Sequence, residues 1–251
     1  MRRSPAPIRP VALVDAAAVA ERVASLLLAD RLRPERPLGL ATGRTMAPVY
    51  AALARRIGAL DPVLAARLRD TWCSFNLDEY VGLEPQHPAS FAATMARQVV
   101  EPLGLAPDRV RLPDGLAPDP ADEARRYADT VHRAGGIGLQ LLGLGLNGHV
   151  GFNEPPSDAA VPCRCVALSA RTRAQNAVDF HGDSSAVPRH AITLGMADIL
   201  SARRVLLVVT GAEKASILRR ALREPPTPEL PASWLQRHPA LTVIVDAAAM
   251  G

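Results

Sequence analysis

The chain has 251 residues, an apolar content of 48% and a formal net charge of +4, which suits one or two α/β domains with a full core. A run of 18 or more apolar residues does not occur, so a membrane span is not expected. The arginines are scattered and only 4% of the residues are aromatic, which favours an anionic small molecule over nucleic acid as the partner.

The N-terminal stretch and the cysteines indicate in which cellular compartment the protein is expected. The first ten residues, MRRSPAPIRP, are basic but lack the apolar segment of a secretory signal, so we expect a cytoplasmic protein. Cys73, Cys163 and Cys165 are odd in number and lack zinc-binding spacing. They are expected to be reduced thiols rather than a disulfide framework or a metal site.

Segments with helical spacing of apolar residues alternate with short apolar runs along the chain. This alternation predicts an α/β fold: a three-layer αβα, Rossmann-like domain over residues 1–251 with a mostly parallel sheet. The Pro-rich stretch 224–231 is expected to be a surface loop. The expected elements are helix 14–30, strand 37–42, helix 49–57, strand 71–76, helices 91–100 and 121–133, strands 137–143 and 205–210, helix 213–222 and strand 241–245.

Four polar, glycine-containing segments directly follow predicted strands. Ligands of such sheets bind outside the carboxyl ends of the strands, so these segments are the expected site. They read ATGRT (41–45), NLDEY (76–80), GLNGHVGFNE (145–154) and GAEK (211–214).

The first segment, ATGRT, has the composition of an anion-binding turn that opens a helix. Helix N-terminal amides bind phosphate well, and the hydroxyl of Thr45 lies beside Gly43 and Arg44 in the sequence. The Walker pattern is missing, and an ordinary Thr N-cap explains the residue equally well.

The GAEK segment contains Lys214, the only lysine among 29 basic residues. At a strand end its ammonium can reach a phosphate held by a neighbouring helix terminus. A Schiff-base nucleophile or a solvated charge are the alternatives. Arg173 in SARTRAQNA can supply a bidentate contact to the same phosphate.

Two adjacent carboxylates, Asp78 and Glu79, lie in NLDEY. Adjacent side chains point in different directions, so only one of them is expected to face the site. A carboxylate there can act as the base on a carbon acid, while its neighbour forms a salt bridge.

The segment LGLGLNGHVGFNEP, 142–155, places His149 and Glu154 five residues apart after an apolar strand. Imidazole and carboxylate are well suited to move protons near neutral pH, and the glycines let the backbone approach a ligand closely. A structural histidine in a Gly-rich turn is the alternative.

These segments together resemble the glucosamine-6-phosphate deaminase family, within the wider group that includes 6-phosphogluconolactonases. FNLDEYVGL and GHVGFNEP favour the deaminases, since the lactonases carry a GHxAS-type loop instead. The resemblance runs in family order from about residue 38 to 246. It rests on LGLATGRT, SFNLDEYVGL with HPASF, LLGLGLNGHVGFNEP, TRAQNA, AITLGMADILSA, VTGAEKA and PASWLQRHP.

The resemblance implies conversion of D-glucosamine 6-phosphate and water to D-fructose 6-phosphate and ammonia, in amino-sugar (N-acetylglucosamine) catabolism. It implies no metal or organic cofactor. Asp78 takes the position of the base that removes the C2 proton and returns it at C1. His149 takes that of the ring-opening catalyst, with Glu154 as its carboxylate partner.

The same resemblance assigns the substrate phosphate to Thr45, Arg173 and Lys214, with amides near Gly43 and Arg44. Arg44 stands where the family usually has a small residue. It either adds a phosphate contact or points to solvent.

Asn147 is the second departure, because many family members have aspartate there. Its oxygen can still accept a hydrogen bond from imidazole and fix the tautomer, but it lacks the charge that stabilises imidazolium. A sugar-phosphate sensor with weakened catalysis is therefore kept as a rival. A deaminase for the galactosamine epimer is a second rival, because no motif reports the contacts to the C4 hydroxyl that decide between epimers.

The region after Glu154 bears on assembly. Asp158 and Val166 stand where the allosteric, hexameric branch of the family carries a hydroxyl and a lysine. The resemblance therefore implies a monomer or small homo-oligomer without allosteric activation.

Overall fold

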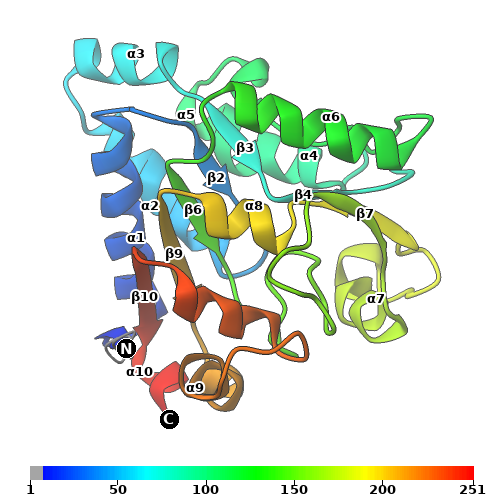
Figure 1. Cartoon of the computed structure of the whole chain (residues 1–251). Coiled ribbons are helices and arrows are strands. Elements are labelled where there is room, and N and C mark those ends of the chain that lie inside the picture. Colours follow the sequence, from blue (N-terminus) through cyan, green and yellow to red (C-terminus); the bar gives the residue numbers. More distant parts are fainter. Residues whose placement is uncertain (1–7) are drawn as a thin grey trace.

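The computed structural model describes residues 8–251, so residues 1–7 of the basic N-terminal stretch lie outside it. Within the described part, a seven-stranded parallel sheet forms the centre of the molecule (Figure 1). The predicted α/β class and mostly parallel sheet are confirmed. In spatial order the strands are β1 (Val11–Leu13), β10 (Leu241–Asp246), β9 (Arg204–Val209), β6 (Leu139–Leu142), β2 (Leu38–Leu40), β3 (Ser74–Asn76) and β5 (Val110–Arg111).

The apolar runs of the sequence form the inner strands of the sheet. Helices cover both faces of these strands, so their side chains are buried on either side. Residues of β2, β6 and most of β9 are buried, as expected for strands that are covered on both faces. Helices α1 and α2 pack together on one face, and α6 and α8 lie on the other (Figure 1). The helices are α1 (Ala16–Arg31), α2 (Met46–Gly58), α3 (Pro62–Asp70), α4 (Phe91–Met95), α5 (Glu101–Leu103), α6 (Pro120–Arg133), α7 (Ala170–Asn176), α8 (Met196–Ser201), α9 (Ala215–Arg223) and α10 (Ala247–Met250).

The predicted helix 91–100 is only partly α-helical. Ser90 caps α4 by accepting a hydrogen bond from the amide of Ala93, and the helix then widens into a π-helical turn, Ala96–Val100. Single π turns of this kind are frequent beside functional sites. The stretch 224–231 is not entirely a surface loop, because Leu230 and Pro231 are buried.

A second, antiparallel sheet was not predicted. It contains β4 (Asp78–Tyr80), β8 (His190–Thr193) and β7 (Arg164–Ala167), in the order β4-β8-β7. The prediction that NLDEY is a segment after a strand is therefore wrong in part, since its last three residues are themselves a strand. These strands have three or four residues each and show no long alternation of apolar and polar positions, so the sequence pattern is weak.

An aromatic cluster packs beside the small sheet. The ring of Tyr80 lies 4.7 Å from Phe91, 5.6 Å from Phe152 and 5.9 Å from Phe180, measured between centroids. These rings belong to a second, smaller hydrophobic cluster, and their contacts stabilise a sheet that has few strands of its own. The cluster thereby fixes β4 against the segments around it.

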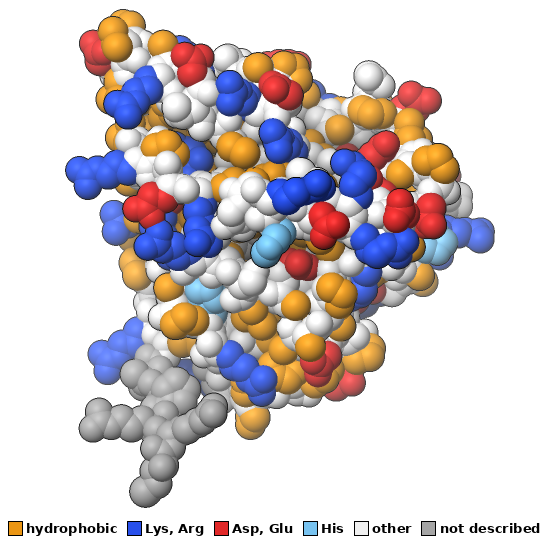
Figure 2. Space-filling model, turned by 45° about the horizontal axis from the view of Figure 1, so that its top comes forward, with side chains coloured by type: hydrophobic (Ala, Val, Ile, Leu, Met, Phe, Trp, Pro, Cys, Tyr) orange, Lys and Arg blue, Asp and Glu red, His pale blue; other side chains and the backbone are white. Residues whose placement is uncertain are grey.

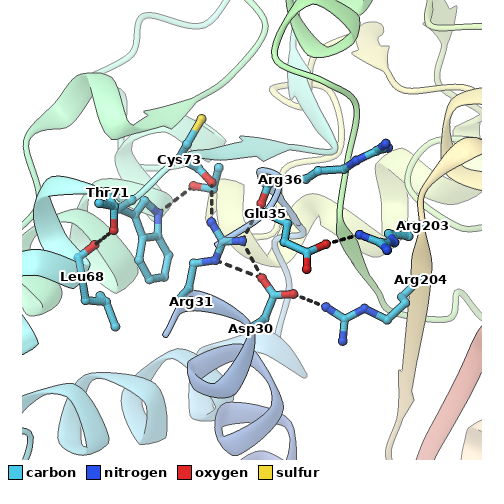
Figure 3. Close-up of polar contacts among 11 residues, drawn as sticks. Asp30, Arg31, Glu35, Arg36, Leu68, Thr71, Cys73, Arg203 and Arg204 are labelled. Atoms are coloured by element: carbon cyan, nitrogen blue, oxygen red, sulfur yellow. Dashed lines mark hydrogen bonds and ion pairs between the residues drawn. The ribbon is translucent and has the colours of Figure 1, made fainter. Parts of the chain in front are cut away.

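A polar network joins the elements at the other end of the parallel strands (Figure 3). The guanidinium of Arg31, buried at the end of α1, pairs with Asp30 at 2.5 Å and donates to the carbonyl of Arg36 at 2.5 Å. Asp30 also pairs with Arg204 of β9, and Glu35 with Arg203. Because Arg31 and Asp30 are both largely buried, this network connects α1 to the sheet.

The surface of the molecule carries charges of both signs. Basic and acidic side chains are interspersed over the face shown in Figure 2. In residues 8–251, none of the helices has the length and apolar character to cross a membrane.

Candidate active site

A cavity of about 720 Å³ opens at the carboxyl ends of the parallel strands. Segments after β2, β6 and β9 line it, together with β4 of the small sheet. This is the position expected for a ligand in such a sheet. Of the predicted site residues, those that line the cavity are Gly43, Arg44, Thr45, Asp78, His149 and Lys214.

The loop after β2 lines the cavity and is fixed to α2. The hydroxyl of Tyr50 donates to the carbonyl of Ala41 at 2.6 Å and fixes the start of the loop to α2. Gly43 has φ +118°, which favours glycine. Thr45 occupies the N-cap position of α2, yet its side chain makes no capping hydrogen bond. The N-cap alternative is thus not observed, and the hydroxyl of Thr45 lies at the cavity beside Arg44.

The loop after β9 brings Lys214 to the same cavity. Asp246 of β10 accepts a hydrogen bond from the amide of Gly211 at 3.1 Å, which ties this loop to the sheet. Lys214 closes a 3₁₀ turn, Ala212–Lys214, and is half-buried. Burial lowers the pKa of Lys214, Glu213 opposes this, and the charge of Arg44 lowers it further.

Two cations, Arg44 and Lys214, therefore lie at one wall of the cavity, where Glu213 is the nearby carboxylate. Among residues 8–251 neither Arg44 nor Lys214 forms an ion pair. The free hydroxyl of Thr45 and the start of α2 lie in the same wall. This combination suits a doubly charged anion such as a phosphate group.

Strand β4 separates the two adjacent carboxylates, as predicted. Asp78 lines the cavity, whereas the Glu79 carboxylate accepts hydrogen bonds from the amides of Tyr80, Phe91 and Ala92 at 2.7–2.9 Å. The expected salt bridge of the second carboxylate is wrong: within the described residues Glu79 is satisfied by backbone N–H groups at the start of α4. Its role is to attach β4 to that helix.

Asp78 has the opposite environment. Its side chain is 5% exposed and has no hydrogen-bond partner in the described part of the chain. Burial, with a smaller contribution from the charge of Glu79, raises the pKa of Asp78 to about 8. A buried, unpartnered carboxylate with a raised pKa is well suited to accept a proton from carbon near neutral pH.

The loop after β6 presents His149. Its Nδ1 lies 2.5 Å from Oδ1 of Asn147, so Nδ1–H donates and Nε2 carries the lone pair. The imidazole lies against Gly145, where a Cβ atom would come within 2.2–2.4 Å of the ring. Burial lowers the pKa of His149 to about 4; the charge of Glu154 opposes this, and those of Lys214 and Arg171 add to it. The ring is therefore neutral at pH 7.

Glu154 and Arg173 do not line the cavity. The carboxylate of Glu154 accepts a hydrogen bond from Thr172 Oγ1 on α7. It makes no hydrogen bond to His149 within residues 8–251, although its charge acts on the ring. Arg173 is half-buried next to Thr172, and its phosphate contact stays a prediction.

The sequence reasoning missed Thr172, which lines the cavity at 3% exposure. Thr172 directly precedes Arg173 in the segment TRAQNA, so the sequence did point to its neighbourhood. It also missed the wall formed by Tyr80, whose hydroxyl accepts a hydrogen bond from Asn176 at 2.8 Å. Tyr80 shares a face of β4 with Asp78, since side chains two residues apart point the same way.

The sequence matches the model of a known family over residues 12–244. That family is described as glucosamine-6-phosphate isomerases/6-phosphogluconolactonase. The chain belongs to this family. A relative from Streptomyces avermitilis, named glucosamine-6-phosphate deaminase, is 45% identical over 233 residues, which cover 92% of this chain and 85% of the relative.

Solved structures of the family share the fold. One described as a monomeric glucosamine-6-phosphate deaminase matches with a TM-score of 0.86 at 32% identity, over 96% of this chain and 98% of that one. A 6-phosphogluconolactonase from Trypanosoma cruzi matches with a TM-score of 0.75 at 18% identity, over 98% of each chain. The second likeness shows the shared fold alone.

Proposed function

We propose that this protein is a glucosamine-6-phosphate deaminase that converts D-glucosamine 6-phosphate and water to D-fructose 6-phosphate and ammonia. The observation that carries the proposal is one cavity with two cations at one wall and with Asp78 and His149 as separate proton-transfer groups. The names of relatives at 42–45% identity support it.

Binding begins at the phosphate. Lys214, Arg44 and the hydroxyl of Thr45 hold the phosphate dianion, and Arg173 is proposed to join them. Contacts at the phosphate position the reacting carbons through binding energy gained away from them.

Ring opening then uses the neutral imidazole of His149. Nε2 takes the proton of the anomeric hydroxyl and returns it to the ring oxygen, which frees the aldehyde. Asn147 keeps the proton on Nδ1, so the lone pair stays on Nε2. The charge of Glu154 stabilises the imidazolium that forms briefly.

Isomerisation uses Asp78. Its carboxylate removes the proton at C2, which the adjacent aldehyde makes weakly acidic, and delivers it to C1. One N–H proton of the enolamine passes to O1, which becomes a hydroxyl, so that the nitrogen at C2 is then part of a ketimine. Water hydrolyses this ketimine to the ketose and ammonia. The net reaction thus hydrolyses a C–N bond through an isomerase-type mechanism, and no cofactor enters the proposal.

Ammonia release from a panel of hexosamine 6-phosphates tests this proposal. We expect release from glucosamine 6-phosphate, with fructose 6-phosphate formed in equal amount. Release from only the galactosamine epimer would support the epimer rival. Binding of the sugar phosphate without ammonia would support the sensor, which Asn147 motivates.

Assembly, organisation and location complete the proposal. We infer a monomer or small homo-oligomer, and the monomeric deaminase among the solved structures supports this. We also propose that residues 1–251 act as one domain in the cytoplasm. The main hydrophobic core includes residues of α1, the inner strands and α9, and a smaller second cluster lies beside the small sheet. The extent of the main core over most of the chain supports the single domain.

A further inference from the structure

Thr172 uses its hydroxyl differently from other helical threonines of this chain. Thr94 and Thr130 donate to the carbonyl four residues earlier, the common behaviour within helices. Thr172 donates instead to the carboxylate of Glu154, 18 residues away in the sequence. The hydroxyl therefore connects α7 to the loop that carries the proposed ring-opening histidine.

The backbone around Thr172 directs it toward this contact. Ser169 caps α7 by accepting a hydrogen bond from the amide of Thr172 at 3.1 Å, which places Thr172 in the first helical turn. The side chain is 3% exposed and lies in the cavity wall. A buried hydroxyl needs a partner, and Glu154 is the one it has.

Glu154 depends on this contact. In residues 8–251 its carboxylate has no other hydrogen bond, although its backbone is held by Phe152 and Ser157. The charged groups that act on His149 are Glu154, Lys214 and Arg171. Glu154 alone opposes the two cations, so its position determines how well imidazolium is tolerated.

We propose that Thr172 is a positioning residue for ring opening, which holds the Glu154 carboxylate where its charge stabilises the protonated His149. This inference rests on the proposed function. Without the hydroxyl, the carboxylate is free to rotate toward solvent. Ring opening slows as a result, while binding of the phosphate and proton transfer by Asp78 are unchanged.

The test compares Thr172→Val, which removes the hydroxyl at nearly constant shape, with Thr172→Ser, which keeps it. We expect Thr172→Val to lower kcat about tenfold, as for the loss of one hydrogen bond to a charged group, with KM nearly unchanged. The kcat of Thr172→Ser is expected to stay within about twofold of the parent value, because serine keeps the hydroxyl that bonds Glu154. Thr130→Val is the matched control, because its hydroxyl bonds only its own helix.

Two further measurements separate positioning from structure. The reduced, open-chain amino alcohol of the substrate needs no ring opening, so its affinity should be equal for the parent and Thr172→Val. In a Glu154→Ala background, Thr172→Val should cause no additional loss of kcat. Thr172→Ala is measured in parallel in case the valine variant does not fold.

The outcomes distinguish this inference from the proposed function. Equal rates for Thr172→Val and the parent, or a loss that is the same in the Glu154→Ala background, would overturn the positioning role. A folded parent that releases no ammonia from any hexosamine 6-phosphate would overturn the proposed function itself.

Discussion

The large parallel sheet and the small antiparallel sheet contribute to the cavity in different ways. Loops that follow β2, β6 and β9 bring Arg44, His149 and Lys214, whereas strand β4 itself carries Asp78. A loop side chain can be replaced with little effect on the sheet behind it. Asp78, by contrast, is held by the pairing of β4 with β8, opposite Thr193.

The two sheets also differ in how charge is handled. At the large sheet, Arg44 and Lys214 meet at the cavity and neither forms an ion pair within residues 8–251, which prepares a site for an anion. At the small sheet, the carboxylate of Glu79 accepts hydrogen bonds from three amides, whereas that of Asp78 accepts none within residues 8–251. The difference teaches that phosphate binding and proton abstraction depend on separate parts of the fold. Substitutions at the large sheet should therefore change mainly KM, and loss of Asp78 in the small sheet mainly kcat.

The largest effect is expected from Asp78→Asn in the small sheet. Loss of the base should lower kcat about a thousandfold with little change in KM, because general base catalysis is worth about 10² to 10⁴. Steady-state ammonia release measures this. Asp179→Asn is the control, since Asp179 lines the same cavity but is exposed.

The pH dependence of kcat/KM checks the same residue. Asp78 must be ionised to act, and its pKa is raised to about 8, so kcat/KM should rise with pH, reach half of its maximum near pH 8 and level off above that pH. A rate independent of pH between 5 and 8, or full activity of Asp78→Asn, would contradict the assignment.

The next effect concerns the large sheet. Lys214→Ala removes a charge-assisted contact to the phosphate, so KM should rise about 10- to 100-fold while kcat changes little. Arg44→Ala should raise KM less, since Arg44 is an addition to the usual family pattern. Arg219→Ala on the exposed face of α9 is the control. Equal KM values for Lys214→Ala, Arg44→Ala and Arg219→Ala would contradict the assignment of phosphate binding to the large sheet.

Glu79→Gln should affect stability rather than chemistry. An amide cannot accept from all three N–H groups as the carboxylate does, so the free energy of unfolding should fall by about 1–3 kcal/mol. Urea denaturation measures this loss, and ammonia release should stay within a few-fold of the parent. A kcat loss as large as that of Asp78→Asn would show that the two carboxylates share the chemistry.

The smallest effect is expected from Asn147→Asp at the large sheet. The new carboxylate still accepts from Nδ1 of His149, and its charge raises the pKa of the ring. Activity at pH 8 should therefore remain within a few-fold of the parent, with an altered pH profile. An inactive but folded Asn147→Asp variant would contradict the tautomer-fixing role of Asn147.

The sequence predicted five of the seven strands of the large sheet, because these five are apolar runs between helical segments, as in the run that becomes β9. The short edge strands β1 and β5 were not predicted. The sequence could not predict the small sheet, whose strands, such as β4, are short and contain carboxylates in place of an apolar alternation. Pairing between β4 and β8, more than 100 residues apart, depends on tertiary contacts that no local pattern reports.

The candidate site shows the same division. Lys214 and His149 could be selected from their position after apolar strands. Asp78 and Glu79 could not be ranked from the residue types alone. The resemblance favours Asp78, and the cavity lining supports that choice, because Asp78 lines the cavity whereas the equally buried Glu79 does not. Thr172 escaped attention because its importance lies in a contact with a distant loop, and a hydroxyl in a helix ordinarily bonds its own backbone.

The single lysine of this sequence gives the protein an unusual chemical property. Amine-selective reagents that acylate or alkylate side chains find one target in the 251 residues besides the α-amino group, and that target lies in the cavity. Its lowered pKa increases the share of reactive free amine. Covalent modification of Lys214 thus reports directly on occupancy of the cavity, while the arginine-rich exterior remains inert to the same reagents.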